Sequence, residues 1–345
     1  MDRDEAREIK LQLADFARDL AERAGTDATA SAAGAPGEDS VAARAVRAPT
    51  LALGLAPREG GGYGIAVRYR LGVPAARSIA RRVASEAGPV VDVRRTGRIR
   101  PLVRTGGTGP RPPVVTAQAA GETGRVRPLR PGVSIAHVDV PAGTLGAVVL
   151  GGDGLHALSN FHVLAGSPRA KVGDAVVQPG PADGGRAPAD QVGTLAATVP
   201  LAPGRTATVD AAIALLDDPD VDLDYPVGRI TTTAVALGGE VVGKIGRTTA
   251  VTAGRVTAIE LDDVVVGYGE GLGALRFDDQ IEVEGTGSGP FSRGGDSGSL
   301  VYREDGVALG LLFAGSETGG ENGTGLTYVN PIDTVLAALD ARLAV

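Results

Sequence analysis

Short apolar runs alternate with polar turns along most of the chain after residue 130. The turns are built from Gly, Pro and Asp, and this spacing is typical of an antiparallel β-barrel protein. Near the end the apolar spacing becomes helical and predicts a terminal helix after Asn330-Pro331. Strands are expected at 131–135, 143–150, 175–177, 192–199, 209–216, 240–245, 255–261, 275–283 and 307–313.

The start of the chain follows a different pattern. Apolar residues recur at helical spacing between residues 4 and 24, which predicts one amphipathic helix at 1–24. Its apolar side could pack on its own domain or on a partner. Residues 25–48 are rich in Ala, Gly, Ser and Asp without periodicity, and we expect a flexible linker there.

Residues 49–104 are predicted to form a small α+β module. Two strands at 50–56 and 63–70 flank a Gly-rich turn, and Pro74 then opens a helix that runs to residue 87. A third strand is expected at 90–94. A Gly/Pro-rich linker at 105–130 then separates this module from a domain at 131–345, which we expect to fold alone.

Many arginines lie within the module. They could form a basic face for a protein partner or regulator, or an ordinary solvated surface. They are Arg68, Arg70, Arg77, Arg81, Arg82, Arg94, Arg95, Arg98, Arg100 and Arg104.

Composition narrows the possible functions. The net charge of −7 argues against nucleic acid or an anionic membrane as the main partner. The chain has no cysteine, which excludes disulfides and thiolate metal sites. The first 24 residues are charged, and no apolar stretch approaches the ~20 residues that a membrane span needs. We therefore expect a soluble cytoplasmic protein.

One Gly-rich segment carries candidate chemistry. Residues 291–300 read Phe-Ser-Arg-Gly-Gly-Asp-Ser-Gly-Ser-Leu. Glycines on both sides of Ser297 would let the backbone turn sharply, expose the hydroxyl, and aim the N–H groups of Gly295 and Ser297 at one point. The same composition also suits a plain hairpin turn.

Two further residues favour catalysis over a plain turn. His162 lies where an apolar strand meets a turn, and Asp210 opens an apolar strand, where a carboxylate is costly to bury unless it is paired. The chain order His, Asp, Ser is that of the chymotrypsin-type triad. His137 and His156 are the other candidate bases, but neither lies at a junction between strand and turn.

On these motifs, the region 131–345 resembles the trypsin-like (chymotrypsin-fold) serine peptidases, and most closely their cysteine-free bacterial type. The resemblance implies two antiparallel six-stranded β-barrels and a docked C-terminal helix. It also implies that Ser297 is the nucleophile, His162 the general base and Asp210 its partner. The backbone N–H groups of Gly295 and Ser297 would form the oxyanion hole, and no cofactor or metal is implied. Ser299 departs from the glycine that animal members usually carry.

The resemblance also points to a substrate pocket. Phe291 would lie at its base, and the strand that pairs with substrate would end at Phe313, Ala314 and Gly315. None of these is acidic, so we expect a small or apolar residue before the scissile bond rather than Lys or Arg. The substrate would be a protein or peptide.

Other readings of the sequence stay open. The fold could serve as a catalytically silent scaffold, or the triad could act as an esterase or transacylase. The acidic run 217–224 could bind calcium or be a solvated loop. In many trypsin-like enzymes, the aspartate before the nucleophile, which corresponds to Asp296 here, pairs with an amino terminus that cleavage has freed. Here we expect backbone donors or a resident cation to satisfy it, and the full-length chain to be active without loss of residues 1–130.

Overall fold

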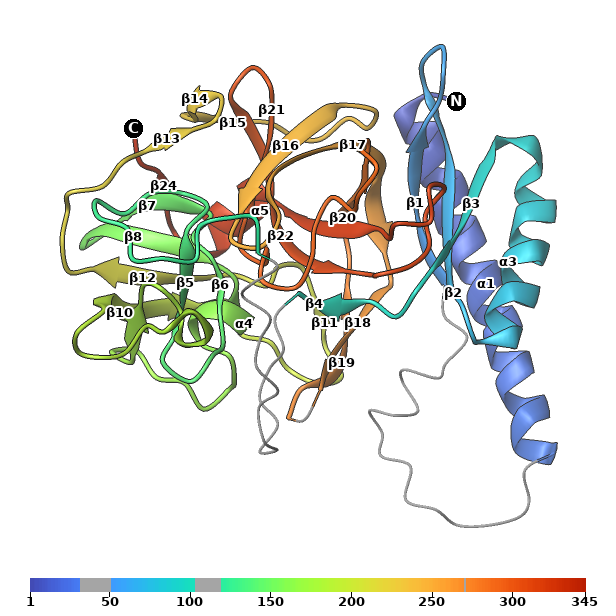
Figure 1. Cartoon of the computed structure of the whole chain (residues 1–345). Coiled ribbons are helices and arrows are strands. Elements are labelled where there is room, and N and C mark those ends of the chain that lie inside the picture. Colours follow the sequence, from blue (N-terminus) through green and yellow to red (C-terminus); the bar gives the residue numbers. More distant parts are fainter. Residues whose placement is uncertain (32–50, 103–118, 270) are drawn as a thin grey trace.

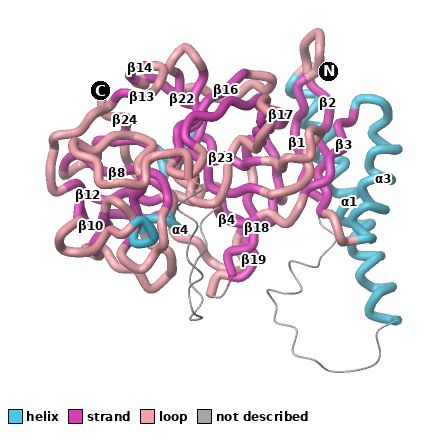
Figure 2. The backbone as a smooth tube through the Cα atoms, viewed as in Figure 1, coloured by secondary structure: helices cyan, strands magenta, loops and turns pink. Residues whose placement is uncertain are grey.

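The computed structural model describes residues 1–31, 51–102, 119–269 and 271–345 (Figure 1). Two mainly antiparallel β-sheets form the bulk of the molecule, and the long helices gather at one end (Figure 2). No helix among the described residues is long and apolar enough to cross a membrane.

Six antiparallel strands close the second barrel. They pair in the order β16-β21-β22-β23-β20-β17, and pairing of β16 with β17 closes the ring. Every pair within the ring is antiparallel, as the alternating pattern predicts. The strands are β16 (Val241–Gly246), β17 (Ala250–Asp262), β20 (Gln280–Gly285), β21 (Leu300–Arg303), β22 (Val307–Gly315) and β23 (Thr327–Pro331).

The first barrel is one curved antiparallel sheet in the order β24-β7-β8-β12-β10-β9-β5-β6. Its last strand, β24, follows the C-terminal helix α5 (Ile332–Ala338) and returns to pair with β7. The mainly β, two-barrel architecture with a C-terminal helix is therefore confirmed, although eight strands share the first sheet. They are β5 (Ser134–His137), β6 (Gly143–Thr144), β7 (Ala147–Gly151), β8 (Gly154–Ser159), β9 (Ala175–Val177), β10 (Gln191–Thr198), β12 (Ala212–Leu216) and β24 (Arg342–Leu343).

Shorter elements connect the barrels. Strands β11, β18 and β19 form a separate sheet, β13 pairs with β14, and β15 pairs with β22. Their bounds are β11 (Thr206–Ala207), β13 (Asp224–Tyr225), β14 (Gly228–Arg229), β15 (Thr232–Thr233), β18 (Val264–Gly269) and β19 (Gly273–Phe277). The short helices here are α4 (Phe161–Leu164) and the 3₁₀ turn Pro181–Asp183.

The N-terminal part contains the expected helix and the expected α+β elements. Helix α1 spans Arg3–Ser31, so residues 25–31 continue the helix instead of starting the linker. Residues 32–50 and 103–118, which contain most of both expected linkers, lie outside the described residues. The other elements are β1 (Leu51–Pro57), β2 (Tyr63–Arg70), α3 (Pro74–Ala87), a 3₁₀ turn (Gly88–Val90), β3 (Val91–Thr96) and β4 (Arg100–Pro101).

The sheet of this module continues into the second barrel. Strand β1 pairs with β17, with Leu53 opposite Asp262 and Leu55 opposite Ile259. Helices α1 and α3 lie side by side over the module's sheet (Figure 1). The apolar side of α1 thus packs within the chain. One buried cluster joins Leu13 of α1 with barrel residues, so module and barrel share a core.

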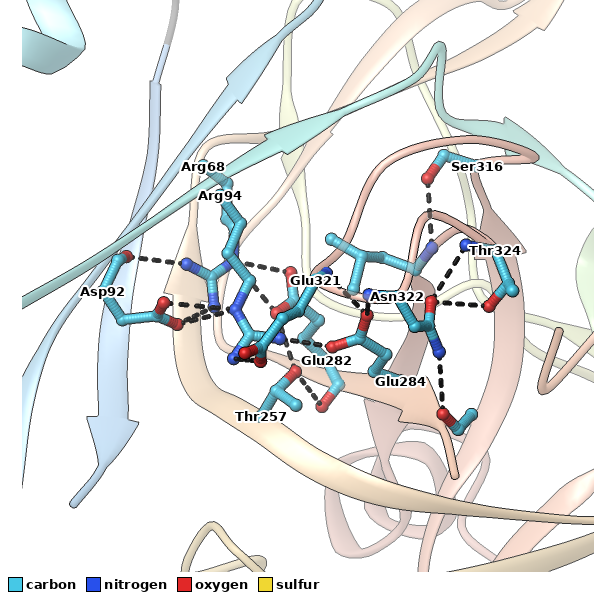
Figure 3. Close-up of polar contacts among 12 residues, drawn as sticks. Arg68, Asp92, Arg94, Thr257, Glu282, Glu284, Ser316, Glu321, Asn322 and Thr324 are labelled. Atoms are coloured by element: carbon cyan, nitrogen blue, oxygen red, sulfur yellow. Dashed lines mark hydrogen bonds and ion pairs between the residues drawn. The ribbon is translucent and has the colours of Figure 1, made fainter. Parts of the chain in front are cut away.

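A buried ionic network reinforces this junction (Figure 3). Arg68 of β2, only 2% exposed, donates from Nε to Glu282 of β20 at 2.8 Å and from Nη2 to Asp92 at 2.8 Å. Burial opposes the charged form, but Glu282 and Asp92 outweigh it and raise the pKa of Arg68. Arg94 pairs with Asp92 and Glu284. These two arginines thus form neither a solvated surface nor a free basic face.

Candidate active site

The three expected catalytic residues come from both barrels. His162 lies on α4, directly after β8 of the first barrel. Asp210 precedes β12, which pairs with β8 so that Ala212 faces Ser159. Ser297 lies in the turn before β21 of the second barrel. Strand pairing therefore sets the His–Asp pair, whereas Ser297 lies on the other sheet, where its hydroxyl bonds to the carbonyl of Phe313 and not to His162.

His162 is fixed by Asp210. Its Nδ1–H donates to Oδ2 of Asp210 at 2.5 Å, and its backbone N–H donates to Oδ1 at 3.2 Å. Both side chains are fully buried. Among the described residues, Nε2 of His162 has no hydrogen-bond partner. With the proton held on Nδ1, the lone pair of Nε2 is available as a base.

Three side chains that sequence reasoning missed hold Asp210 in place. Tyr268 donates its hydroxyl to Oδ2 of Asp210 at 2.5 Å, and burial, together with the charge of Asp210, raises the pKa of this tyrosine. Asn330 accepts from the backbone N–H of Asp210 at 2.9 Å, and Asn160 donates to its carbonyl at 2.7 Å. A buried carboxylate needs a donor such as the Tyr268 hydroxyl, and the two asparagines fix the backbone of Asp210. Tyr268 and Asn330 are far away in the sequence, so no local pattern could have indicated them.

The turn at Ser297 needs its glycines. Gly295 and Gly298 have φ angles of 101° and 94°, in the left-handed region that favours glycine. A Cβ on Gly298 would lie 2.0 Å from Oγ of Ser159. The hydroxyl of Ser297 is fully buried and donates to the carbonyl of Phe313 at 3.3 Å. The expectation of an exposed serine is therefore wrong: Ser297 has no exposed surface, and residues 100–101 pair with the nearby end of β22.

The N–H of Gly295 points into this cleft and donates to the carbonyl of Leu102. Thr248 sets this direction, because its hydroxyl donates to the carbonyl of Gly294 at 2.8 Å. In a trans peptide, a carbonyl and the following N–H point in opposite directions. Thr144 holds the next carbonyl, that of Gly295, at 2.8 Å, and its own N–H donates to the carbonyl of Ser297.

Asp296 is satisfied without a new amino terminus, as expected. Its Oδ1 accepts from the backbone N–H groups of Thr248 and Thr249 at 2.9 and 3.0 Å. Its Oδ2 accepts from the backbone of Arg293 and lies 3.6 Å from Nζ of Lys244. Burial lowers the pKa of Lys244, and Asp296 partly offsets this. The carboxylate of Asp296 thus has backbone donors and a resident cation.

The expected substrate-binding strand is already paired. Ala314 faces Pro101 and Gly315 faces Arg100 in an antiparallel register. The carbonyl of Phe313 accepts from the N–H of Leu102 at 3.4 Å. Phe291 is buried in the cluster against which Leu102 packs. A cleft of about 520 Å³ adjoins this strand pair, and its walls include Arg98, Arg100, Leu102, Pro141, Arg247 and Gly295.

The other candidate residues lie elsewhere. His137 contacts Asp174 through Nε2 at 3.2 Å, and His156 contacts Asp153 at 2.9 Å, so neither takes part in the site. In the acidic run, carboxylates such as Asp218 cap their own turns. Within the described ranges, no group of three or more His, Asp or Glu residues could hold a metal ion.

Comparison with known proteins gives matches among solved structures alone. No family model matches the sequence, and no curated protein sequence matches it significantly. Protease A of Thermobifida fusca is 21% identical, with a TM-score of 0.44, over 63% of this chain and 98% of that chain. Cellulomonas bogoriensis chymotrypsin is 21% identical (TM-score 0.43), over 63% of this chain and 98% of that chain. Nocardiopsis protease is 17% identical (TM-score 0.44), over 63% of this chain and 99% of that chain. The proteins to which this chain is similar in fold are thus bacterial serine proteases of the chymotrypsin type.

Proposed function

We propose that the chain is a serine endopeptidase in which Ser297, His162 and Asp210 act as a triad. One observation carries the proposal. A buried histidine, oriented through Nδ1 by a carboxylate, keeps its Nε2 unpaired, and in the turn of Ser297 the backbone N–H of Gly295 binds a peptide carbonyl. Leaving a polar atom buried and unpaired costs about 1–3 kcal/mol. The unpaired Nε2 of His162 is explained if this atom accepts the serine proton during catalysis.

In the proposed reaction, Oγ of Ser297 attacks the substrate carbonyl while Nε2 of His162 takes its proton. The oxygen of the tetrahedral intermediate receives the N–H of Gly295, and we place the N–H of Ser297 in the same hole. His162 then protonates the leaving amine. Water hydrolyses the acyl-enzyme by the same steps in reverse.

A peptide fits the site better than a simple ester. Ala314 and Gly315 pair with a peptide strand through backbone hydrogen bonds, which a small ester cannot reproduce. We take Phe291, which is buried in the cluster against which Leu102 packs, as the apolar base of the substrate pocket, so the residue before the scissile bond should be apolar or small. The experiment below distinguishes the peptidase from an esterase and from a catalytically silent scaffold.

Labelling with a fluorophosphonate probe tests the proposal. The wild-type chain should label on prolonged incubation, while Ser297→Ala should not. His162→Ala should lose about as much activity as Ser297→Ala, because triad members act as a unit. Ser292→Ala is the matched control, since Ser292 lies in the same loop and bonds to Thr327 instead. Labelling of the Ser297→Ala protein would refute the assignment, and turnover of esters alone would favour the esterase.

A further inference from the structure

A buried ion pair joins the two barrels beside the turn that carries Ser297. Arg247 lies between β16 and β17 of the second barrel. Asp183 ends the 3₁₀ turn Pro181–Asp183, which lies between β9 and β10 of the first barrel. Arg247 is 4% exposed, and the side chain of Asp183 has no exposed surface. Buried charges are costly unless they are paired, and here the two partners come from different sheets.

The guanidinium of Arg247 binds Asp183 as a fork. Its Nε donates to Oδ2 of the carboxylate at 2.7 Å, and its Nη2 donates to Oδ1. Parallel hydrogen bonds of this kind fix the orientation of both groups as well as their distance. Asp183 has a further donor in its own barrel, since the hydroxyl of Ser134 on β5 donates to Oδ2 at 2.6 Å.

Arg247 also contacts both threonines that hold the carbonyls of the oxyanion turn. Its backbone N–H donates to Oγ1 of Thr144 at 3.0 Å, and its Nη1 donates to Oγ1 of Thr248 at 3.2 Å. Thr144 donates to the carbonyl of Gly295 at 2.8 Å. Thr248 donates to the carbonyl of Gly294 at 2.8 Å. The arginine therefore supports the turn on both sides of the N–H that binds a peptide carbonyl.

The pair lies where the candidate site is divided between the barrels. Within the part of the chain that the structure describes, Nε2 of His162 has no hydrogen-bond partner, and Ser297 bonds to Phe313 instead. The distance between base and nucleophile therefore depends on how the barrels contact each other. A misplacement of about 1 Å can cost about 100-fold in rate. A Cβ on Gly295 would come within 3.0 Å of Nη1 of Arg247, so the guanidinium also packs directly against the turn.

We propose that Asp183 and Arg247 are a positioning pair for the reaction. They set the oxyanion turn of the second barrel against the first barrel, which carries His162. The inference rests on the proposed function and adds two residues that act through Thr144 and Thr248. A buried ion pair is weak evidence for stability, because apolar residues of similar volume often serve as well. The planar fork of an arginine has the further use of fixing an orientation.

Replacing Arg247 by lysine tests the fork. Arg247→Lys keeps the charge but offers a point donor in place of the planar guanidinium. The kcat for peptide hydrolysis should fall about 10-fold, less than the about 100-fold that loss of an oxyanion donor causes, while KM changes little. Fluorophosphonate labelling should also slow, because the phosphoryl oxygen would use the same hole. The kcat is expressed per labelled Ser297, so that unfolded protein does not count.

Two further variants test the partner and provide the control. Asp183→Asn keeps an acceptor for Ser134 but cannot accept from both N–H groups of the arginine, so kcat should fall here too. Arg276→Lys is the matched control. Arg276 donates to Asp263 at 2.7 Å in the β18–β19 hairpin, where both side chains are partly exposed. Exposed ion pairs contribute little, so this variant should keep the wild-type kcat, KM and labelling rate.

A double variant shows whether Arg247 acts through the turn. Arg247→Lys/Thr248→Val should lose less kcat than the product of the two single losses, because residues in contact that share one role are not additive. Losses that multiply to within about twofold, as for independent sites, would refute the inference.

The other contrary outcomes distinguish this inference from the proposed function. If the wild type labels at Ser297 and Arg247→Lys keeps its kcat and labelling rate, the pair has no positioning role, whereas the peptidase proposal stands. A rise in KM with unchanged kcat refutes the inference equally, because Arg247 would then act on substrate binding. If the wild type does not label, the proposed function fails along with the inference.

Discussion

At the level of single residues, the candidate site depends on the orientation of a few backbone N–H and carbonyl groups. The N–H of Gly295 is useful for catalysis only because the carbonyl before it is held away from the cleft. Thr248 holds that carbonyl, and its backbone N–H also supports Asp296. Thr248 is therefore a positioning residue that acts through Gly295.

Replacing Thr248 tests this role. Thr248→Val keeps the shape and the backbone bond to Asp296 but removes the hydroxyl. The kcat for peptide hydrolysis should fall with little change in KM, and by less than the about 100-fold that loss of an oxyanion donor causes. Thr248→Ser should restore kcat. Equal effects of the two variants on kcat would show that the hydroxyl does not position the hole.

At the level of elements, the paired strands β17 and β20 have two structural roles. They close the second barrel, and they also provide the partners for β1 and for Arg68. The carboxylate of Glu282 has further donors in Thr257 at 2.8 Å and Tyr328 at 3.4 Å. These neutral donors do not replace the charge of the buried guanidinium.

Removing that charge should destabilise the chain. Arg68→Met leaves Glu282 buried with neutral donors alone, and breaking such a pair costs about 3–5 kcal/mol. The free energy of unfolding from urea titration measures the loss. The double variant Arg68→Met/Glu282→Gln should recover much of it. Arg81→Met, at an exposed arginine on α3, is the control and should change stability little.

The opposite result would show that the Arg68–Glu282 pair does not stabilise the contact between the module and the second barrel. If Arg68→Met unfolded with the same free energy as Arg81→Met, the ionic network would contribute nothing net, and the shared apolar core alone would join the module to the barrel.

At the scale of the whole molecule, the module and the second barrel form one folded unit. The sheet continues from β17 into β1, β2 and β3, and one apolar cluster includes residues of α1, α3 and the barrel. The division of the chain near residue 105, expected from composition, thus crosses a continuous sheet. A fragment starting near residue 125 would leave one side of β17 without its strand partner.

This continuity predicts what happens when an added protease cuts the chain between residues 102 and 119. The two fragments should elute together in gel filtration under native conditions, because such a cut breaks none of the hydrogen bonds between β1 and β17. They should separate only in denaturant. Separate elution of the two fragments in native buffer would show that the peptide link, rather than the shared core, holds the module in place.

Features that depend on neighbouring residues could be predicted from the amino-acid sequence alone. Alternating apolar positions predicted the strands, and helical spacing predicted α3 and α5. The glycines around Ser297, and the positions of His162 and Asp210 at strand ends, indicated the candidate triad. Each of these patterns is local, because side-chain direction repeats with the period of its own element.

Contacts between groups that are distant in the sequence depend on the three-dimensional fold. The Tyr268 hydroxyl on Asp210, the Arg68 pair with Glu282, and the Leu102 carbonyl on Gly295 all join separate elements. A short sequence window contains no information on such contacts, since strand pairing across the molecule creates them. The burial of Ser297 was missed for the same reason, because the segment that pairs with the nearby end of β22, residues 100–101, is far away in the sequence.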